Sequence, residues 1–205
     1  MANLKNLSER IKSVTSIQQV TKAMKMVAAA KVKKAQEKME ISRPYSKSTQ
    51  ELICRILPQI SVSDISLVEK RKVKNTGIIV ITSDRGFAGS FNSSVIRFAE
   101  KEIEKLGKDS VELFCLGKKA SEYFSKRDFN VKETYFDFWK DMNYDTASKI
   151  SASFINSFEN NEIDEVHVIY NRFKTLASQD LIMEKVLPVD FTADYNATNY
   201  NYDYE

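Results

Sequence analysis

The chain has 205 residues, of which 42% are hydrophobic and 29% are charged. This balance is typical of folded globular proteins, and the presence of only five glycines and three prolines argues against collagen-like or many-stranded all-β folds. No apolar run approaches the ~18–20 residues of a membrane span, and the first residues lack the apolar stretch of a secretory signal. The two cysteines, Cys54 and Cys115, are too few for a disulfide scaffold, so we expect reduced thiols in apolar surroundings.

Charge is unevenly distributed along the chain, although the net charge is only +3. The first 48 residues hold 11 basic and three acidic side chains, a net of +8, whereas the remainder carries a net of −5. A basic arm on a mildly acidic body predicts a negatively charged partner for the arm. Nucleic acid, anionic lipid and an acidic protein surface all meet this requirement. A solvated face that keeps a long helix soluble is the remaining explanation.

The first expected element is one long helix, which forms a shaft over residues 1–57. Its apolar residues follow the three- and four-residue steps of a coiled-coil seam. They are Leu4, Leu7, Ile11, Val14, Ile17, Val20, Met24 and Val27, followed by Ala28, Val32, Ala35 and Met39. Pro44 should kink or end this helix, which resumes through Leu57 and stops at Pro58. Such a seam requires a second helix, from this chain or from another.

An α/β domain is expected after the shaft. Residues 58–76 are expected to form a polar, basic linker, residues 77–189 the domain, and residues 190–205 a tyrosine-rich acidic tail. Short apolar runs alternate with amphipathic stretches, which favours a parallel sheet with helices on its faces. The expected strands are 77–82, 111–116, 131–138, 166–170 and, at an edge, 181–186, and the expected helices are 92–106, 118–127 and 144–160.

The loop between the first strand and the first helix of this domain occupies the position at which doubly wound folds bind phosphate. It contains Gly86 and Gly89, but it has neither the third glycine of a dinucleotide loop nor the lysine of a P-loop. Asp84 in this loop would repel phosphate. We therefore expect a structural turn in which Asp84 and Arg85 pair or contact a partner, followed by a helix that Asn92 or Ser93 caps.

No constellation of catalytic or metal-binding residues emerges from the sequence. The only histidine, His167, lies in an expected strand and has no companions at the spacing of a metal site or a catalytic triad. We therefore expect no catalytic residue, no bound cofactor and no metal. The basic shaft has no aromatic residue before Tyr45, so it offers no stacking platform for single-stranded nucleic acid.

Several short motifs along the chain form a recognisable set. They are Arg10–Val14 (RIKSV), Ile17–Val20 (IQQV), Thr21–Lys31 (TKAMKMVAAAK), Arg43-Pro44-Tyr45, Ile81–Gly86 (ITSDRG), Gly89–Asn92 (GSFN), Tyr170–Lys174 (YNRFK) and Ser178-Gln179. This set strongly resembles the gamma subunit of F-type ATP synthase, and the resemblance covers essentially the whole chain.

The resemblance implies a non-catalytic rotor subunit, the central stalk that couples proton transport to ATP synthesis and hydrolysis. In that family two long helices wind as an antiparallel coiled coil inside a hexamer of alpha and beta subunits, and a Rossmann-like foot contacts the epsilon subunit and the c-subunit ring. The residues implied are Lys22, Met24, Lys25 and Lys31 for the alpha and beta subunits, and Tyr202, Tyr204 and Glu205 for the c ring or epsilon. The implied location is peripheral, on the cytoplasmic face of a bacterial inner membrane, which the protein meets only through the Fo sector.

Two departures from the family pattern accompany the resemblance. Phe87-Ala88-Gly89-Ser90 replaces the usual Leu-Cys-Gly-Gly, and the segment Tyr202–Glu205 matches the residues just before the family's C-terminal helix. We therefore expect that helix to be absent from this chain. Two alternatives from other classes stay open, namely a nucleotide-dependent α/β enzyme and a basic coiled-coil adaptor for nucleic acid. Nucleotide titration tests the first, and a salt-dependent DNA shift tests the second.

Overall fold

A computed structural model describes residues 2–57, 65–175 and 178–189. The chain divides into two units, the N-terminal helix α1 and a sheet domain that begins at Leu57. Each unit is described by itself.

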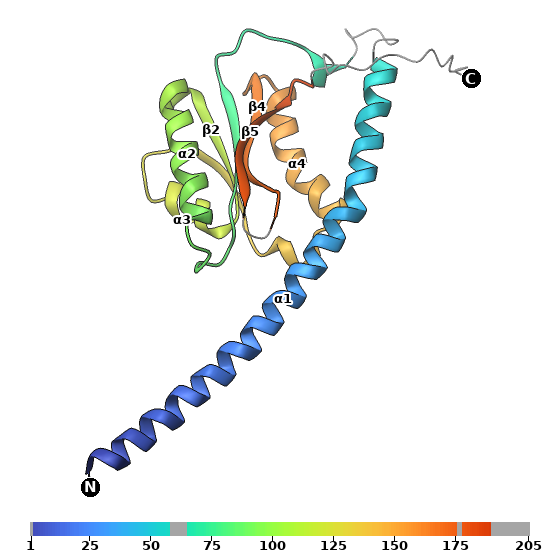
Figure 1. The fold of residues 1–205 in the computed structure, drawn as a ribbon. Helices are drawn as coiled ribbons and strands as arrows, with labels where there is room; N and C mark the ends of the chain where they lie inside the picture. The colour runs from blue at the N-terminus through green and yellow to red at the C-terminus, as the bar shows by residue number, and fades with distance from the viewer. Residues whose placement is uncertain (1, 58–64, 176–177, 190–205) are drawn as a thin grey trace. The chain divides into compact units, whose positions relative to one another are not determined.

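Helix α1 runs without interruption from Ala2 to Ile56 and contains 55 residues (Figure 1). It holds no glycine, and alanine, lysine, glutamate, glutamine and methionine, all strong helix formers, make up much of its surface. The helix continues through Pro44, and this proline therefore does not terminate it. The ribbon shows a single curved helix rather than two separate ones (Figure 1). The long shaft helix predicted from the seam is confirmed.

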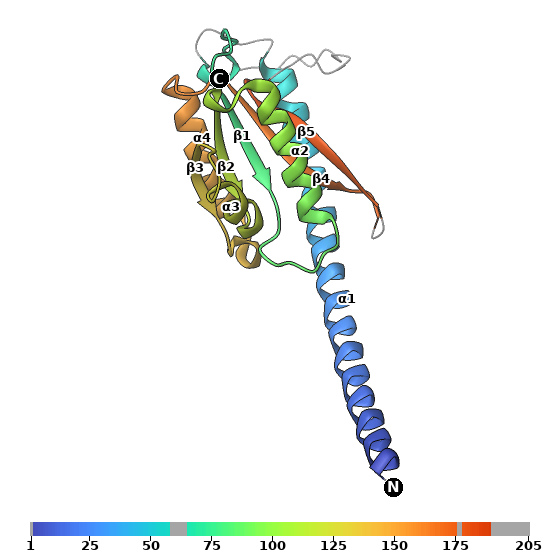
Figure 2. The same cartoon turned by 90° about the vertical axis from the view of Figure 1, so that its left-hand side faces the viewer.

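The sheet domain is built on five strands in the order β3-β2-β1-β4-β5 (Figure 2). The strands are β1 (Thr76–Ile81), β2 (Val111–Leu116), β3 (Val131–Tyr135), β4 (Glu165–Phe173) and β5 (Gln179–Leu187). The first four run parallel, and β5 pairs antiparallel with β4 at the edge. The predicted strands are all present, but the sheet is mixed because a short connection returns the chain beside β4.

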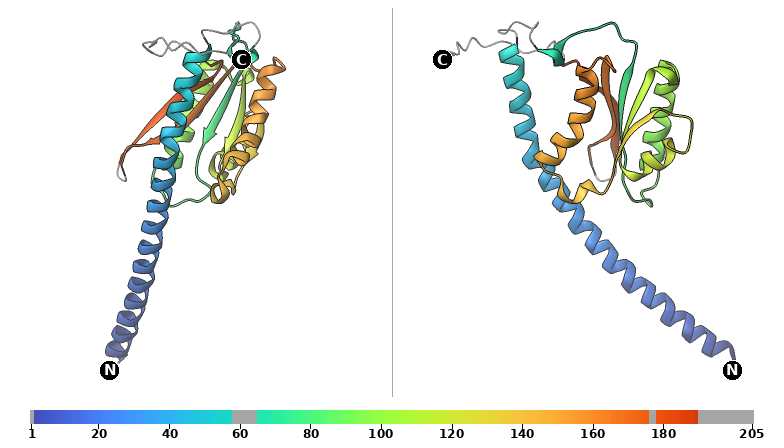
Figure 3. Two further views of the ribbon diagram at one scale, coloured as in Figure 1. Left: turned by 90° about the vertical axis from the view of Figure 1, so that its right-hand side faces the viewer. Right: turned by 180° about the vertical axis from the view of Figure 1, so that it is seen from behind.

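Helices cover both faces of the sheet (Figures 1 and 3). Helices α2 (Phe91–Leu106) and α3 (Lys118–Phe124) pack on one face, where Val80, Phe124 and Ile103 are fully buried in one core cluster. Helix α4 (Tyr144–Glu159) packs on the other, where Phe114 and Phe158 belong to a second cluster. Three-layer packing of this kind is what alternating strands and helices predict.

The segment expected to be a linker differs from that prediction in its described part. Residues 66–68 form a short 3-10 helix, η3, and Val68 in it is buried. Arg71 lies over the Phe158 ring at 4.2 Å, and the backbone of Lys74 is hydrogen-bonded to Asp164. A polar composition suggested solvent exposure, but charged groups with suitable partners can pack as closely as apolar ones.

Candidate functional site

The apolar seam of α1 lies on the surface of the molecule. Leu4 is 74% exposed and Leu7 is 55% exposed, and the other members of the seam through Val27 fall between 56% and 65%. Isolated exposed apolar side chains are common, but a continuous stripe over several helical turns is not. A helix gains most of its stability from packing such a face. The seam is therefore a surface that requires a partner.

Lysines flank this seam, and those singled out from the sequence are all exposed. Lys22, Lys25 and Lys31 make no ion pair within the described ranges, and Met24 between them is 65% exposed. Two other lysines of α1 pair weakly with glutamates one turn later, over 3.9 Å in Lys33–Glu37 and 3.8 Å in Lys47–Glu51. Exposed pairs of this kind contribute at most about 1 kcal/mol each. The positive charge of the shaft therefore remains available to a negatively charged partner.

The second candidate site is the loop that follows β1, at the carboxyl edge of the sheet. Its key residue is Asp84, whose Oδ1 accepts a hydrogen bond from the Lys118 backbone N–H at 2.9 Å. The Oδ2 atom of Asp84 accepts another from the Asp137 backbone N–H at 3.1 Å. This carboxylate joins the loop to the start of α3 and to the segment after β3. The predicted structural turn is confirmed, although no ion pair between Asp84 and Arg85 occurs there.

The remaining polar groups of the loop are also satisfied internally. The Thr82 hydroxyl accepts from the buried Ala120 N–H at 2.9 Å, and the Asn92 Oδ1 accepts from the Ser83 N–H at 2.9 Å. Asn92 therefore ties the loop together and does not cap α2; Ser90 occupies the N-cap position without a side-chain bond, so the predicted cap was wrong. Asp84 and Thr82 already use amides of the first turn of α3. An anion bound to these backbone amides would have to displace the Asp84 carboxylate.

Glycine is required at one point of this edge. Gly117 has φ +109, and a Cβ there would lie 2.1 Å from the Thr82 carbonyl oxygen. The tip of the loop is open in contrast, because Gly86 and Gly89 have no atoms near a Cβ position. Phe87 at this tip has φ 60 and is fully exposed. The departure at Phe87–Ser90 thus lies at a projecting turn and not in the core.

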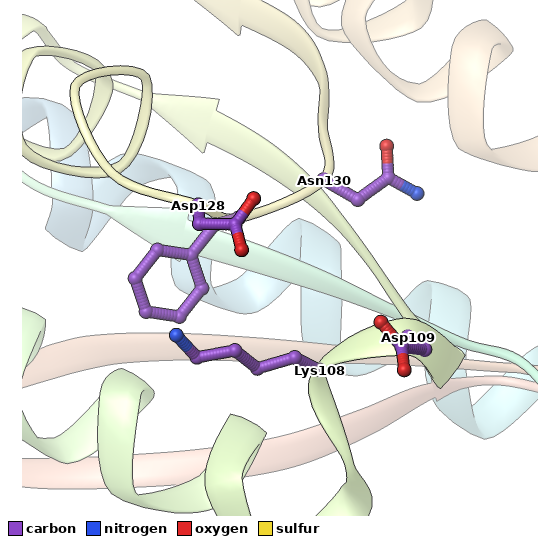
Figure 4. Close-up of a pocket in the computed structure, with 5 residues that line it drawn as sticks. Lys108, Asp109, Asp128 and Asn130 are labelled. Atoms are coloured by element: carbon purple, nitrogen blue, oxygen red, sulfur yellow. The ribbon is translucent and has the colours of Figure 1, made fainter.

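Two surface hollows are formed by described residues of the sheet domain, and the lining of each has a structural explanation. One of about 330 Å³ is lined by Lys108 and Asp109 on one side and by Asp128, Phe129 and Asn130 on the other (Figure 4). The Lys108 ammonium lies 4.3 Å from the centroid of the Phe129 ring, a cation–π contact. The other, of about 350 Å³, lies beside Tyr135. Burial, together with a hydrogen bond to Glu133, raises the pKa of Tyr135 to about 12, so this phenol stays neutral.

The single histidine and the buried cysteine each lie in surroundings that suit a structural role. His167 Nε2 lies 3.0 Å from Glu165 Oε2 on the same strand. Burial raises the pKa of the Cys115 thiol to about 12, so it is not a thiolate, and both cysteines are free, as predicted. Within the described ranges, no three His, Cys, Asp or Glu side chains are placed to hold a metal ion. None of the helices described there combines the length and apolar character of a membrane span.

The residues implied for the foot contacts, Tyr202, Tyr204 and Glu205, lie outside the described residues, as does the expected tail 190–205. Sequence reasoning missed the two charged residues that organise the segment before β1, Arg71 and Asp164. The signal available for them was weak. It consisted of the apolar pair Leu67-Val68 inside an otherwise polar stretch.

Comparison with known proteins identifies one family over almost the whole chain. The sequence profile of the family described as ATP synthase matches residues 3–205. The chain is 37% identical to the ATP synthase gamma chain of Brevibacillus brevis, over 98% of this chain and 71% of that protein. It is 35% identical to the ATP synthase gamma chain of Heliobacterium modesticaldum, over 97% of this chain and 68% of that protein.

A solved structure resembles this fold as well. The structure of the central stalk and c-ring of Tetrahymena thermophila mitochondrial ATP synthase contains a chain that superposes with a TM-score of 0.65 at 26% identity. The match covers 87% of this chain and 80% of that one. The likeness therefore includes more than the sheet domain alone.

Proposed function

The chain belongs to the ATP synthase gamma chain family, and we propose that it is the central rotor stalk, which couples ion flow to ATP synthesis and hydrolysis at sites on other subunits. One observation carries this proposal: a 55-residue helix whose apolar seam and lysines are exposed together. A helix of ~1.5 Å rise per residue is over ~80 Å long, which is long enough to reach deep into a surrounding assembly. It can turn there only if partners hold it laterally.

The proposed partners follow from the chemistry of the two units. The seam of α1 fits an apolar helix, and the flanking lysines Lys22, Lys25 and Lys31 fit acidic loops of the alpha and beta subunits. Met24 lies between the first two lysines and would contact those loops directly. The sheet domain would contact the epsilon subunit and the c-ring, including through Tyr202, Tyr204 and Glu205. With these partners, the proposed location is peripheral, on the cytoplasmic face of a bacterial inner membrane.

The sheet domain supports the non-catalytic role. The loop after β1 occupies the position at which α/β folds bind phosphate, but Asp84 and Thr82 fill it with the chain's own groups. We therefore expect no saturable ATP binding at micromolar concentration. Such binding, if lost on Gly86→Val, would instead support the nucleotide-dependent enzyme.

The experiment that tests the rotor proposal changes one contact of the shaft within the assembled synthase. Met24→Lys places a third positive charge in one helical turn and should impair coupling of ion flow to ATP synthesis more than it impairs assembly. Met24→Leu keeps the apolar volume and serves as the matched control. The readouts are the amount of assembled complex and the ratio of ATP synthesis to ATP hydrolysis. Normal coupling in both variants at all temperatures would contradict the assigned contact.

A disulfide test addresses the foot. Tyr204→Cys should cross-link to a cysteine in the polar loop of the c subunit in the assembled enzyme. Tyr45→Cys, at an exposed position of α1, is the control and should give no such product. If Tyr204→Cys yields no cross-link, the terminal residues are not the c-ring contact.

A further inference from the structure

Strand β3 lies at one edge of the sheet and pairs with β2 (Figure 2). Among the described residues, no strand lies on its other side. A hollow of about 350 Å³ is lined by the end of β3, the residues after it and helix α4. We propose that this edge and this hollow form a docking site for an extended segment of a partner protein, which adds a strand beside β3. The segment carries a large apolar side chain and, two residues later, an acidic one.

The backbone of β3 directs hydrogen-bonding groups toward its open side. The Tyr135 carbonyl oxygen accepts from the N–H of Gly117, the residue directly after β2, at 2.7 Å. Peptide groups of neighbouring residues in a strand point in opposite directions, so those of Thr134 point away from β2. Thr134 is also exposed. Backbone donors and acceptors on an open edge are a template for pairing with another strand.

The usual protection of an exposed edge is weak in β3. Edge strands commonly carry a lysine or a proline that prevents pairing with another chain. Strand β3 contains no proline, and the ammonium of its one lysine, Lys132, is bound to Glu112 at 3.0 Å and to Glu162. Both carboxylates belong to the sheet domain, so they neutralise this charge locally. The edge can therefore accept a further strand.

The hollow lies where side chains of an added strand would fall. Side chains of a strand alternate between the two faces of a sheet, so every second one would lie on the face that α4 covers. Thr134 and Tyr135, which are neighbours and so point to opposite faces, both line the hollow, which therefore extends to the edge of β3. Tyr135, Phe136, Phe138 and Ile150 give it mainly aromatic and aliphatic walls. Such walls fit a large apolar side chain.

The walls of the hollow are held in place by contacts within the domain. The Asp137 N–H donates to Asp84 Oδ2 at 3.1 Å, and Phe138 packs against the second core cluster. On the side of α4, the Asn143 side chain caps the helix by accepting from the Thr146 N–H at 2.9 Å. A site whose walls are already ordered loses little conformational entropy when a side chain enters it.

One charged side chain lines the hollow, and it favours an acidic partner. Lys149 is exposed on α4 and pairs with no carboxylate among the described residues. The nearby Glu133 carboxylate accepts from the Tyr135 hydroxyl, so it already has a partner. An acidic side chain two residues beyond the apolar one lies on the same face of the added strand, roughly 7 Å further along, within reach of a long lysine side chain. This spacing defines the proposed apolar and acidic pair.

The experiment measures binding of synthetic peptides to the full chain. The probe is an eight-residue peptide of threonine and valine that contains one leucine and, two residues later, a glutamate; the matched peptide has lysine in place of the glutamate. Trp139, the only tryptophan of the chain, reports binding by fluorescence, because its ring lies 4.3 Å from that of Phe138. The chain variants are Lys149→Glu and, as the matched control, Lys101→Glu at an exposed position of α2, which covers the opposite face.

We expect the glutamate peptide to bind about tenfold more tightly than the lysine peptide, because a charge-assisted bond to Lys149 is gained. Lys149→Glu should reverse this preference, and Lys101→Glu should leave it unchanged. A preference that Lys149→Glu does not alter would overturn the assigned contact. Absence of binding at about 1 mM peptide would overturn the docking site itself.

Backbone methylation of the peptide tests the added strand without changing the chain. N-methyl groups on alternate residues block one edge of the peptide, and the matched peptide carries them on the intervening residues. One of the two should lose binding and the other should retain it, because an added strand pairs through a single edge. Equal binding of both would show that the peptide adds no strand. A dimer of the chain that the glutamate peptide dissociates, detected by light scattering, would assign the edge to a second copy and overturn the proposed partner.

Discussion

The apolar seam of helix α1 and strand β1 are built from similar residues but meet opposite surroundings. Ile78 in β1 is completely buried, whereas Ile17 in α1 is 62% exposed. Side chains that pack on both faces of the sheet cover strand β1. Helix α1, in contrast, exposes a seam of comparable hydrophobicity along about half its length. The comparison shows that apolar residues alone do not define a core. The sheet domain covers β1 with its own side chains, whereas the seam of α1 is exposed and fits a partner surface.

The largest expected contrast is in hydrogen exchange. In the dilute chain, amides of Leu4 through Val27 should exchange with little protection, because an uncovered helix is only marginally stable. Amides of β1 and β2 should be protected up to the global unfolding free energy, about 5–15 kcal/mol for an ordinary domain. Mass spectrometry of exchanged peptides measures both.

Light scattering on the same sample supplies the control. If the chain associates, a second copy can cover the seam and protect it. Strong protection of α1 in a sample of monomeric mass would mean that the helix finds a partner surface on its own chain, and the contrast between the two regions would disappear.

The next effect is a difference in stability between two substitutions of one residue type. Ile78→Ala should lower the free energy of unfolding of the sheet domain by about 2–5 kcal/mol, because it leaves a cavity in a close-packed core. Ile17→Ala should change it by no more than about 0.5 kcal/mol, since that side chain is mostly solvated. Denaturant titration followed by Trp139 fluorescence measures both values. Equal losses would show that α1 contributes to the core of the sheet domain.

A smaller contrast concerns two threonine hydroxyls. Thr82→Val leaves the buried Ala120 N–H without its acceptor and should cost about 1–3 kcal/mol. Thr15 on α1 donates to the Ile11 carbonyl oxygen at 2.8 Å but is exposed, so Thr15→Val should be nearly neutral. The same titration tests the pair. A neutral Thr82→Val would mean that the edge of the sheet rearranges to satisfy the amide.

The smallest effect is a dependence on pH. Burial alone would raise the pKa of Asp164, but hydrogen bonds from the Asn75 and Lys74 amides and the charge of Arg71 hold it below its usual value. A carboxyl whose pKa is lower in the folded state stabilises that state above the unfolded pKa of about 3.9, and loses this contribution as pH falls through the folded pKa. Asp164→Asn should therefore weaken the domain at neutral pH and flatten its acid-induced loss of stability.

Glu37→Gln on α1 is the control for this measurement, because its ion pair with Lys33 spans 3.9 Å in solvent. It should leave the pH profile of unfolding unchanged. A profile that Glu37→Gln alters as much as Asp164→Asn would contradict the assigned role of the hydrogen-bonded Asp164 carboxylate.

Local patterns in the sequence predicted most elements of the fold. The run from Val111 to Leu116 is β2 with the predicted bounds, and the amphipathic stretch from Tyr144 is α4. The edge strand β5 was also expected, but its antiparallel direction was not, because strand direction depends on the path of the connection and not on the residues of the strand. Helix α3 ends at Phe124, three residues before its predicted end.

The candidate sites divide in the same way. The seam and lysines of the shaft were readable because helical periodicity places them on one surface without any tertiary contact. The contacts of Arg71 and Asp164 were not readable, because these residues are far apart in the chain and meet only when the domain folds. The side chain of Asn92 was assigned to a cap for the same reason, since its true partner, Ser83, lies on the other side of the loop.

The sequence by itself determined a long basic helix with an exposed apolar seam, an α/β domain, and the family to which both belong. Periodicity, composition and short motifs predict those features, because helices and strands follow largely from local interactions along the chain. Only the tertiary structure decided which polar groups are satisfied by one another. Asp84 fills the edge of the sheet where a phosphate would otherwise bind, and Arg71 and Asp164 hold the polar segment before β1 against the residues that follow α4. Hydrogen bonds between distant residues depend on direction and distance, which no local pattern specifies.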